Sequence, residues 1–194
     1  MWRALVLSVF LLVTGCGAPA PQAWRTTDIS GADFGRALSG LTDHHGKPTT
    51  LADFRGKVVL VFFGYTACPD ACPTALARFV GVMKAIAADA ERVQVLFVTL
   101  DPARDTPEKL AAYVPWFYPS FIGLYGEPAA IAAAAREFKV FFARSPGSQG
   151  MGYLIDHSTA AYGFDPAGRI RLYIKDDASV ADIVADVRRL LAEK

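Results

Sequence analysis

Two cysteines, Cys68 and Cys72, have the residue type and the spacing that chemistry could use. Each cysteine precedes a proline, and a residue before proline is pushed away from the α region, so we expect both on extended or turn backbone. Pro73 then suits the first position of a helix. A loop of this kind lets the two sulfur atoms form a disulfide, about 2.05 Å apart, or bind one metal ion, roughly 4 Å apart.

The helix that should begin after this pair favours the reactive thiolate form of cysteine. Cys72 at the helix entrance feels the partial positive charge there, which stabilises the thiolate, the form that binds metals and attacks disulfides. The alternative is a static structural disulfide, but structural bridges rarely lie with two prolines on a strand-to-helix turn. We therefore expect Cys68 and Cys72 to form a redox-active or metal-binding pair.

The apolar pattern on either side of the pair predicts the elements that position it. Continuous apolar residues indicate a buried strand before the pair, at 57–64, and a second one at 93–100. Between these strands, apolar side chains three and four apart predict an amphipathic helix over 73–90. The first strand should therefore deliver the cysteines to the start of this helix.

Thr106 and Pro107 begin the next predicted helix, as its capping residue and its first residue. This helix should run to about Phe117. Arg104 and Asp105 then read most simply as parts of the cap and of the surface.

The rest of the chain also alternates strands and helices. We expect a hairpin at 41–51 that turns at 43–46, a helical turn at 51–54, a strand at 121–125, a helix at 128–138, a strand at 140–143, a mobile glycine-rich loop at 145–152, a hairpin at 160–174 and a last helix at 179–191. This order implies parallel pairing through right-handed crossovers, followed by an antiparallel edge. The sequence therefore predicts an α/β protein, a thioredoxin-like sandwich whose central mixed sheet has helices on both faces and an N-terminal β-hairpin extension.

Three histidines are the other candidate ligands. His157 enters the terminal hairpin, and in a thioredoxin-like fold that segment passes beside the cysteine loop. Two thiolates and one imidazole form a soft, low-coordinate set that suits Cu(I), with Cu(II) and Zn(II) also open. His44 and His45 are adjacent in a turn, where we expect them to face water in different directions rather than to bind metal.

The N-terminal residues have the pattern of an export signal. A short positive flank at Arg3 precedes an apolar run at 4–13 that is too short to span a bilayer, and small residues lead to Cys16. This resembles a bacterial lipoprotein signal, so we expect a signal peptide at 1–15, a lipidated tether at 16–32 and the folded domain at 33–194. An uncleaved anchor and an ordinary secretory signal are the alternatives.

All three signals would export the domain to a compartment where disulfides persist. We expect a lipoprotein of the bacterial cell envelope, anchored through Cys16 with its domain on the periplasmic side. The formal net charge is +1, and the sequence has no basic stripe of the kind that nucleic-acid binders need. Nucleic acid is therefore excluded as a partner.

Three segments of the chain together resemble the Sco/SenC family of copper chaperones. They are Gly-Tyr-Thr-Ala-Cys-Pro-Asp-Ala-Cys-Pro at 64–73, Asp-Pro-Ala-Arg-Asp-Thr-Pro at 101–107 and Tyr-Leu-Ile-Asp-His-Ser at 153–158. They occur in the family's order, and the resemblance covers roughly residue 33 to the C-terminus. Three motifs together are far more specific than one cysteine pair.

The resemblance implies one copper ion per domain, Cu(I) or Cu(II), bound by Cys68, Cys72 and His157. It implies a role in assembling the dinuclear copper centre of cytochrome c oxidase, with the copper-site subunit of that oxidase and other copper carriers as partners. Asp101 and Asp156 would lie beside the ligands or help in docking. Members of the family often have histidine before the first cysteine where this chain has Ala67, a departure that removes no expected ligand.

A thiol-disulfide oxidoreductase that reduces the cysteines of the oxidase subunit is the rival function, with Cys68 and Cys72 as its redox pair. Thioredoxin-type reductases commonly place a cis-proline beside the active disulfide, yet no proline occurs between Pro146 and Pro166. A peroxiredoxin-like peroxidase would need threonine three residues before the reactive cysteine, where this chain has Tyr65. The copper chaperone is therefore the leading interpretation.

Overall fold

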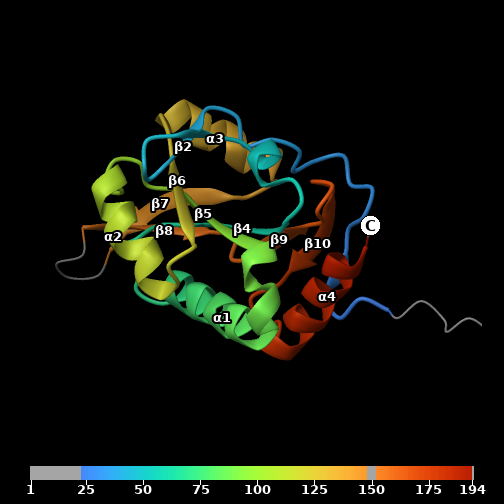
Figure 1. Ribbon diagram of the computed structural model, residues 1–194. Helices are drawn as coiled ribbons and strands as arrows, with labels where there is room; N and C mark the ends of the chain where they lie inside the picture. The colour runs from blue at the N-terminus through green and yellow to red at the C-terminus, as the bar shows by residue number, and fades with distance from the viewer. Residues whose placement is uncertain (1–22, 148–151, 194) are drawn as a thin grey trace, which may run out of the picture.

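A mixed sheet of eight strands forms the centre of the fold (Figure 1). The computed structural model describes residues 23–147 and 152–193, so the expected signal peptide, Cys16 and the middle of the glycine-rich loop lie outside the described residues. In sheet order the strands are β1 (Thr27–Asp28), β10 (Ile170–Ile174), β9 (Ala161–Phe164), β4 (Val58–Gly64), β5 (Val93–Thr99), β6 (Ile122–Tyr125), β2 (Leu41–Asp43) and β3 (Pro48–Thr49).

Strands β4, β5 and β6 are parallel, and every other pairing in this sheet is antiparallel. All residues of β4 and β5 are buried because helices cover both faces of the sheet. Figure 1 shows α1 (Ala71–Ile86) and α4 (Val180–Ala192) below the strands and α3 (Pro128–Glu137) above them. The predicted sandwich with a central mixed sheet is confirmed.

Helix α2 (Pro107–Phe117) packs on β6 and beside α1. The Thr106 hydroxyl accepts a hydrogen bond from the backbone N–H of Lys109, as expected of a capping residue. Ser179 caps α4 in the same way. Both predicted helix starts are confirmed.

Helix α1 begins at Ala71, two residues before the predicted start, so the expectation that Cys72 lies on extended or turn backbone is wrong. The first N–H groups of a helix have no intrahelical partner, so Pro73 in the first turn costs no hydrogen bond. The N–H of Cys72 instead donates to the Cys68 sulfur, 3.3 Å away. That bond stabilises the earlier start.

The predicted helix over 73–90 is divided in the structure. Helix α1 ends at Ile86, and Ala87 has a positive φ of 48° that leads into the 3-10 helix η2 (Ala87–Arg92). Residues 71–92 form the one helical stretch of the described chain that is long and apolar enough to cross a membrane by length and composition alone. In the fold this stretch packs against α4 and β5, so its apolar side chains belong to the core.

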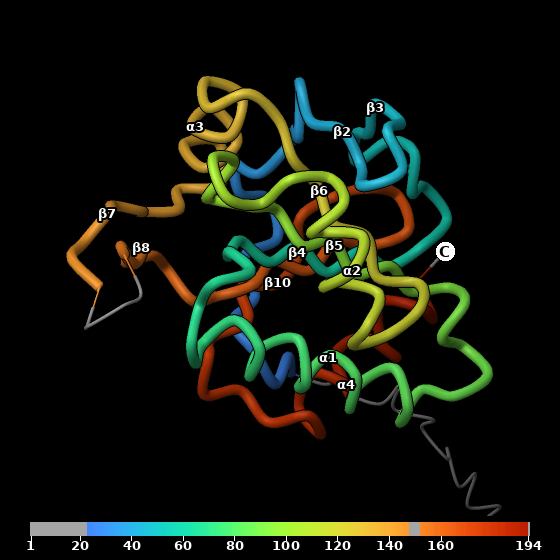
Figure 2. Tube along the Cα trace, turned by 90° about the vertical axis from the view of Figure 1, so that its left-hand side faces the viewer, coloured from blue at the N-terminus to red at the C-terminus, as the bar shows by residue number. Residues whose placement is uncertain are grey.

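The second sheet is a hairpin of β7 (Phe142–Pro146) and β8 (Tyr153–His157), which projects from the body (Figure 2). The predicted strand at 140–143 covers only the start of β7, and we expected residues 153–159 only to lead into the terminal hairpin. All five residues of β7 are exposed or half-buried, so no alternation of apolar residues marks it in the sequence. His157 is the last residue of β8.

The predicted hairpin at 41–51 is present as β2 and β3, followed by the 3-10 helix η1 (Leu51–Phe54). It is part of the main sheet, because β2 pairs with β6. At the opposite edge, β1 pairs with β10, and the Asp186 carboxylate accepts hydrogen bonds from the N–H groups of Arg25 and Thr26. The folded part therefore begins before residue 33, where we expected it to start.

Candidate metal centre

Cys68, Cys72 and His157 lie together where the end of β4 meets α1 and β8. The Cys72 sulfur is 3.5 Å from Nε2 of His157, and the donor atoms of all three residues lie within 4.8 Å of one another. Cys72 is fully buried, whereas Cys68 is half-buried in the loop before α1. Both are free thiols, so the structure brings together two sulfur donors and one nitrogen donor. His157 follows Cys72 by 85 residues along the chain.

The imidazole of His157 is held in one orientation. Its Nδ1 lies 2.8 Å from the carbonyl oxygen of Ser158, and because a carbonyl only accepts, Nδ1 carries the proton. In the neutral imidazole the lone pair is then on Nε2, the atom that faces Cys72. The rings of Phe62 and Tyr65 contact the imidazole edge-on, with centroids 6.2 and 5.9 Å away.

Gly64, the last residue of β4, makes room for the buried sulfur. A Cβ atom at this position would lie 2.8 Å from the Cys72 sulfur and 2.9 Å from the ring of Phe62. Real Cβ contacts are essentially never this short. The absent side chain lets the Cys72 sulfur pack directly on the strand end.

The two thiols have opposite pKa shifts. A hydrogen bond from the Cys72 thiol is the largest cause that lowers the pKa of Cys68, and a hydrogen bond with His157 and the backbone N–H groups of Asp70 and Cys72 add to it. The same hydrogen bond and burial raise the pKa of Cys72. Cys68 is therefore the first to become a thiolate and is also the sulfur that solvent can reach. Binding a metal through both sulfurs must release the proton of Cys72.

We expect alkylation of Cys68 by iodoacetamide to remain fast as the pH falls from 8.5 to 6. A lowered pKa extends the thiolate form to lower pH, whereas an ordinary thiol of pKa about 8.5 would lose roughly 160-fold of its thiolate over the same range. Fragment-ion mass spectrometry of the labelled peptide measures the rate at Cys68 and at the buried Cys72 separately. The Cys72→Ala variant is the control, because it removes the stabilising hydrogen bond and should move the pH midpoint of Cys68 upward. An ordinary thiol profile for Cys68 in the unaltered protein would contradict the assignment.

Asp105 holds the cysteine loop, which the sequence did not indicate. Its carboxylate is buried and accepts hydrogen bonds from the N–H of Thr66 at 3.0 Å, from the Thr66 hydroxyl at 2.6 Å and from the Thr99 hydroxyl at 2.6 Å. The expectation that Asp105 belongs to the cap of α2 and to the surface is wrong. A run of Asp-Thr-Pro has the local pattern of a helix start, and nothing local shows that the aspartate turns inward.

Asp101 is linked to the metal centre indirectly, through β8, the strand that carries His157. Its fully buried carboxylate accepts a hydrogen bond from the Tyr153 hydroxyl at 2.6 Å and pairs with Arg104. The Arg104 guanidinium donates to the Tyr153 carbonyl at 2.9 Å and lies 3.7 Å from the centroid of its ring. Asp101 and Arg104 therefore fasten the start of β8. Arg104 is not the surface residue that we expected.

Three other residues that the sequence singled out do not join the three donors. The side chain of Asp156 is exposed on β8, and we find no hydrogen bond or ion pair of its carboxylate in the described residues. His44 is buried rather than facing water, because its Nδ1 accepts the N–H of Gly123 at 2.9 Å. The rings of His44 and His45 are in contact, with centroids 4.2 Å apart, and neither joins the cluster.

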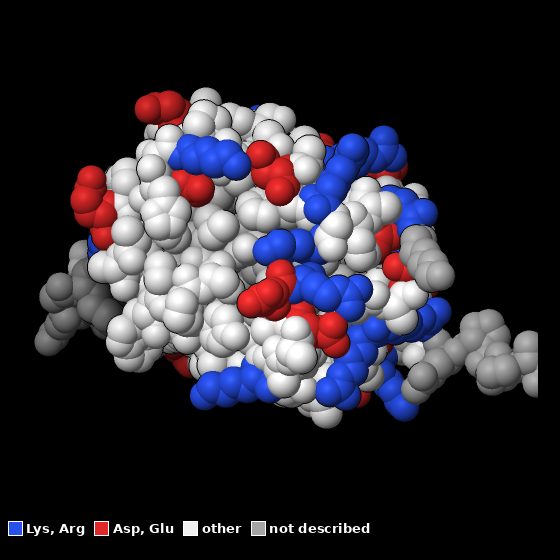
Figure 3. Space-filling view, in the orientation of Figure 1, with Lys and Arg blue, Asp and Glu red and all other residues white. Residues whose placement is uncertain are grey.

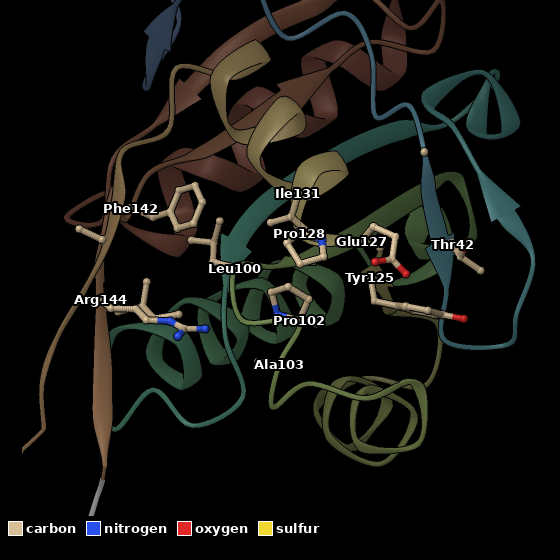
Figure 4. Close-up of a pocket in the computed structure, with 14 residues that line it drawn as sticks. Thr42, Leu100, Pro102, Ala103, Tyr125, Glu127, Pro128, Ile131, Phe142 and Arg144 are labelled. Carbon is tan, nitrogen blue, oxygen red and sulfur yellow. The ribbon is translucent and has the colours of Figure 1, made fainter.

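A cavity of about 670 Å³ lies on the α3 side of the β7–β8 hairpin. Figure 4 shows Phe142 and Arg144 of β7 on one wall, with Thr42 and Tyr125 on the opposite wall. Leu100 lies between these walls. Neither cysteine nor His157 lines this cavity, so it is separate from the candidate metal centre.

The model of the family described as SCO1/SenC matches residues 28–192 of the chain. The mouse protein "Protein SCO2 homolog, mitochondrial" is 38% identical over 173 residues, which covers 88% of this chain and 68% of the mouse protein.

Two solved structures that carry copper are similar in fold as well as in sequence. The structure of Bradyrhizobium japonicum ScoI with copper bound superposes with a TM-score of 0.71 at 38% identity, covering 78% of this chain and 96% of that one. The crystal structure of yeast Sco1 with copper bound has a TM-score of 0.69 at 31% identity, covering 77% and 83%.

Proposed function

Because the chain belongs to the SCO1/SenC family, we propose that it is a copper chaperone that binds one copper ion through Cys68, Cys72 and His157. The single observation that carries the proposal is the cluster of two thiols and one imidazole within 4.8 Å. Two soft sulfurs and one nitrogen suit Cu(I), and the nitrogen also favours Cu(II). The protein is then a binding and transfer protein, with copper as its cargo.

Each ligand has a distinct part in the proposed transfer. The buried Cys72 and the oriented His157 would keep hold of the ion, because neither can move without disturbing the core or β8. The half-buried Cys68 would be the ligand that a receiving protein displaces. Asp101, Arg104 and Tyr153 would set the position of His157, and we retain Asp156 as a docking residue because its carboxylate is exposed beside His157.

We propose that the ion goes to the copper-site subunit of cytochrome c oxidase, for its dinuclear copper centre, or is exchanged with other copper carriers. This follows from the family and from the motifs that the chain shares with it. The domain would lie on the extracytoplasmic side of a bacterial membrane, held by a lipid on Cys16. The first described residues lie on the right of Figure 1 and the start of α1 on the left, so the tether would leave the body far from the cysteines.

Replacing Cys16 with serine should release the protein from the membrane fraction, since two or more acyl chains are what make a lipid anchor stable. Fractionation of cells followed by immunoblotting measures the distribution. Copper binding by the released protein should be unchanged, because the metal centre lies in the folded domain. A variant that stays with the membrane would instead indicate that the apolar run at 4–13 acts as an uncleaved anchor.

A thiol-disulfide oxidoreductase is the second candidate function, favoured by the opposite pKa shifts of the two thiols. The Cys68 thiolate could attack a disulfide of the oxidase subunit and release one of its thiols. Cys72 would then displace the second thiol, leaving a reduced subunit and a Cys68–Cys72 disulfide. The position of His157 beside both sulfurs has no part in this reaction, which is why we prefer the chaperone.

An anaerobic copper titration of the soluble domain tests the proposed function. The reduced domain should bind one Cu(I) and lose both reactive thiols, because metal binding requires thiolates. The domain with its cysteine pair oxidised should bind none, since a disulfide sulfur is a poor ligand. Copper content and thiol count are measured on the same samples. Stoichiometric copper in the oxidised domain would show that the cysteines are not the site.

A further inference from the structure

The exposed side of α2 carries no charge beyond its first turn. Glu108 and Lys109 are the last charged residues before Glu127, and no histidine lies between them. The exposed residues of this stretch are Ala111, Ala112, Trp116, Pro119 and Ser120, which we call the α2 face. Figure 3 shows the side of the molecule over α2 as a largely white area, whereas charged side chains gather on the opposite side.

Trp116 is the most exposed large hydrophobic side chain of the described residues, at 79%. It is nevertheless held in place by a chain of ring contacts. The ring centroids of Trp116 and Phe117 are 5.1 Å apart, and those of Phe117 and Tyr113 are 5.2 Å apart. The ring of Tyr113 in turn contacts Phe97 in the core, with centroids 5.9 Å apart. A tryptophan that is already fixed loses little conformational freedom when a partner covers it, and such residues dominate binding energy at interfaces.

A hollow of about 330 Å³ separates Trp116 from the cysteine loop. Thr66, Lys109, Ala112 and Tyr113 line the rest of it. Thr66 is two residues before Cys68, so the hollow adjoins the metal centre. The Tyr113 hydroxyl is buried and has no hydrogen-bond partner among the described residues.

The burial of the metal centre limits how a second protein can reach it. Cys72 is fully buried, whereas Cys68 and His157 are half-buried, so a protein that displaces Cys68 must cover the partly open side that Cys68 shares with His157. A standard interface covers about 800 Å² on each partner, which is a disc of about 16 Å radius. A disc of that size centred on Cys68 extends past Thr66 onto the α2 face.

We propose that the α2 face is the docking surface for the protein that exchanges copper with Cys68, and that an apolar side chain of that protein enters the hollow between Trp116 and Thr66. The inference rests on the proposed function. The partner's matching surface is uncharged and apolar, because the interior of a specific interface is depleted of charge and the α2 face offers none to pair. Lys109 lines one side of the hollow, but its ammonium lies 3.9 Å from the Asp105 carboxylate, so its charge is already paired within this protein.

The test measures binding of the copper-loaded domain to the soluble copper-site domain of the cytochrome c oxidase subunit by calorimetry. Trp116→Ala should weaken binding roughly 30-fold or more, as expected when a central tryptophan is removed. Ala112→Glu, which places a charge at the hollow, should weaken it to a similar extent. Ala181→Glu is the matched control, because it makes the same change at an exposed helix position on α4, and it should leave the Kd within about twofold of the unaltered protein.

All three variants must bind one copper and retain both thiols, which shows that the fold and the metal centre are intact. Binding by Trp116→Ala and Ala112→Glu as tight as that of Ala181→Glu would overturn the docking surface and leave the chaperone function standing. Failure of the unaltered protein to bind the oxidase domain would overturn both proposals. Self-association of the unaltered protein that Trp116→Ala abolishes would also overturn the inference, because the α2 face would then be an interface between two copies of this chain.

Discussion

His157→Ala should abolish the Cu(II)–thiolate absorption band and prevent oxidase assembly in cells, while thiol-disulfide activity on a model substrate persists. Cu(II) prefers nitrogen and needs more donors than two thiolates provide, and Nε2 of His157 is the one nitrogen in the cluster. Disulfide exchange uses only the sulfurs and the helix entrance that tunes them. The visible spectrum after copper addition, copper content and the activity of the oxidase in a complemented deletion strain are the measurements.

His45→Ala is the control for this variant, because His45 is an exposed histidine that lies outside the cluster. It should keep the absorption band and support assembly. Full oxidase assembly with His157→Ala would contradict the chaperone function and support the oxidoreductase function. Loss of thiol-disulfide activity together with copper binding would show instead that the change disturbs the cysteine loop.

Asp105→Ala should lower the free energy of unfolding by about 3 kcal/mol, the largest stability effect that we expect from a single change near the site. The carboxylate is about 1% exposed and accepts three hydrogen bonds from Thr66 and Thr99. Removing it leaves buried donors without an acceptor in the loop and the strand that flank the cysteines. Chemical denaturation of the reduced, metal-free domain measures the change.

Glu108→Ala is the control, since it removes a nearby carboxylate that is exposed, in the first turn of α2. It should leave the free energy of unfolding essentially unchanged. Because Asp105 fixes Thr66, its loss should also make the thiol of Cys72 accessible to alkylation in the folded protein. An Asp105→Ala variant as stable as the control would mean that its three hydrogen bonds are replaced by water or by other groups.

Local pattern was enough to predict the strand, loop and helix that carry the cysteines. The apolar run of β4 has the length and the β-branched content of a buried strand, and Pro69 after Cys68 marks the turn. The starts of α2 and α4 likewise depend on adjacent residues, Thr106–Pro107 for α2 and Ser179 for α4. These features depend on neighbours in the chain, which is why they are readable without the fold.

The arrangement around the sulfurs depends on contacts between distant parts of the chain. Asp105 binds Thr66, 39 residues away, and Arg104 binds Tyr153, 49 residues away, so their local sequence resembles an ordinary helix start and surface. Strand β8 pairs with β7 outside the main sheet and buries little apolar surface, so periodicity does not reveal it.

The start of α1 at Ala71 depends on the Cys68 sulfur accepting the Cys72 N–H, which outweighs the preference of a residue before proline. This bond also determines where the donors lie: Cys72 enters the helix and becomes buried, while Cys68 stays in the loop and remains partly open. Residue types and spacing thus establish which atoms could bind a metal. Packing of β4, α1 and β8 establishes that these atoms meet and which of them a partner can reach.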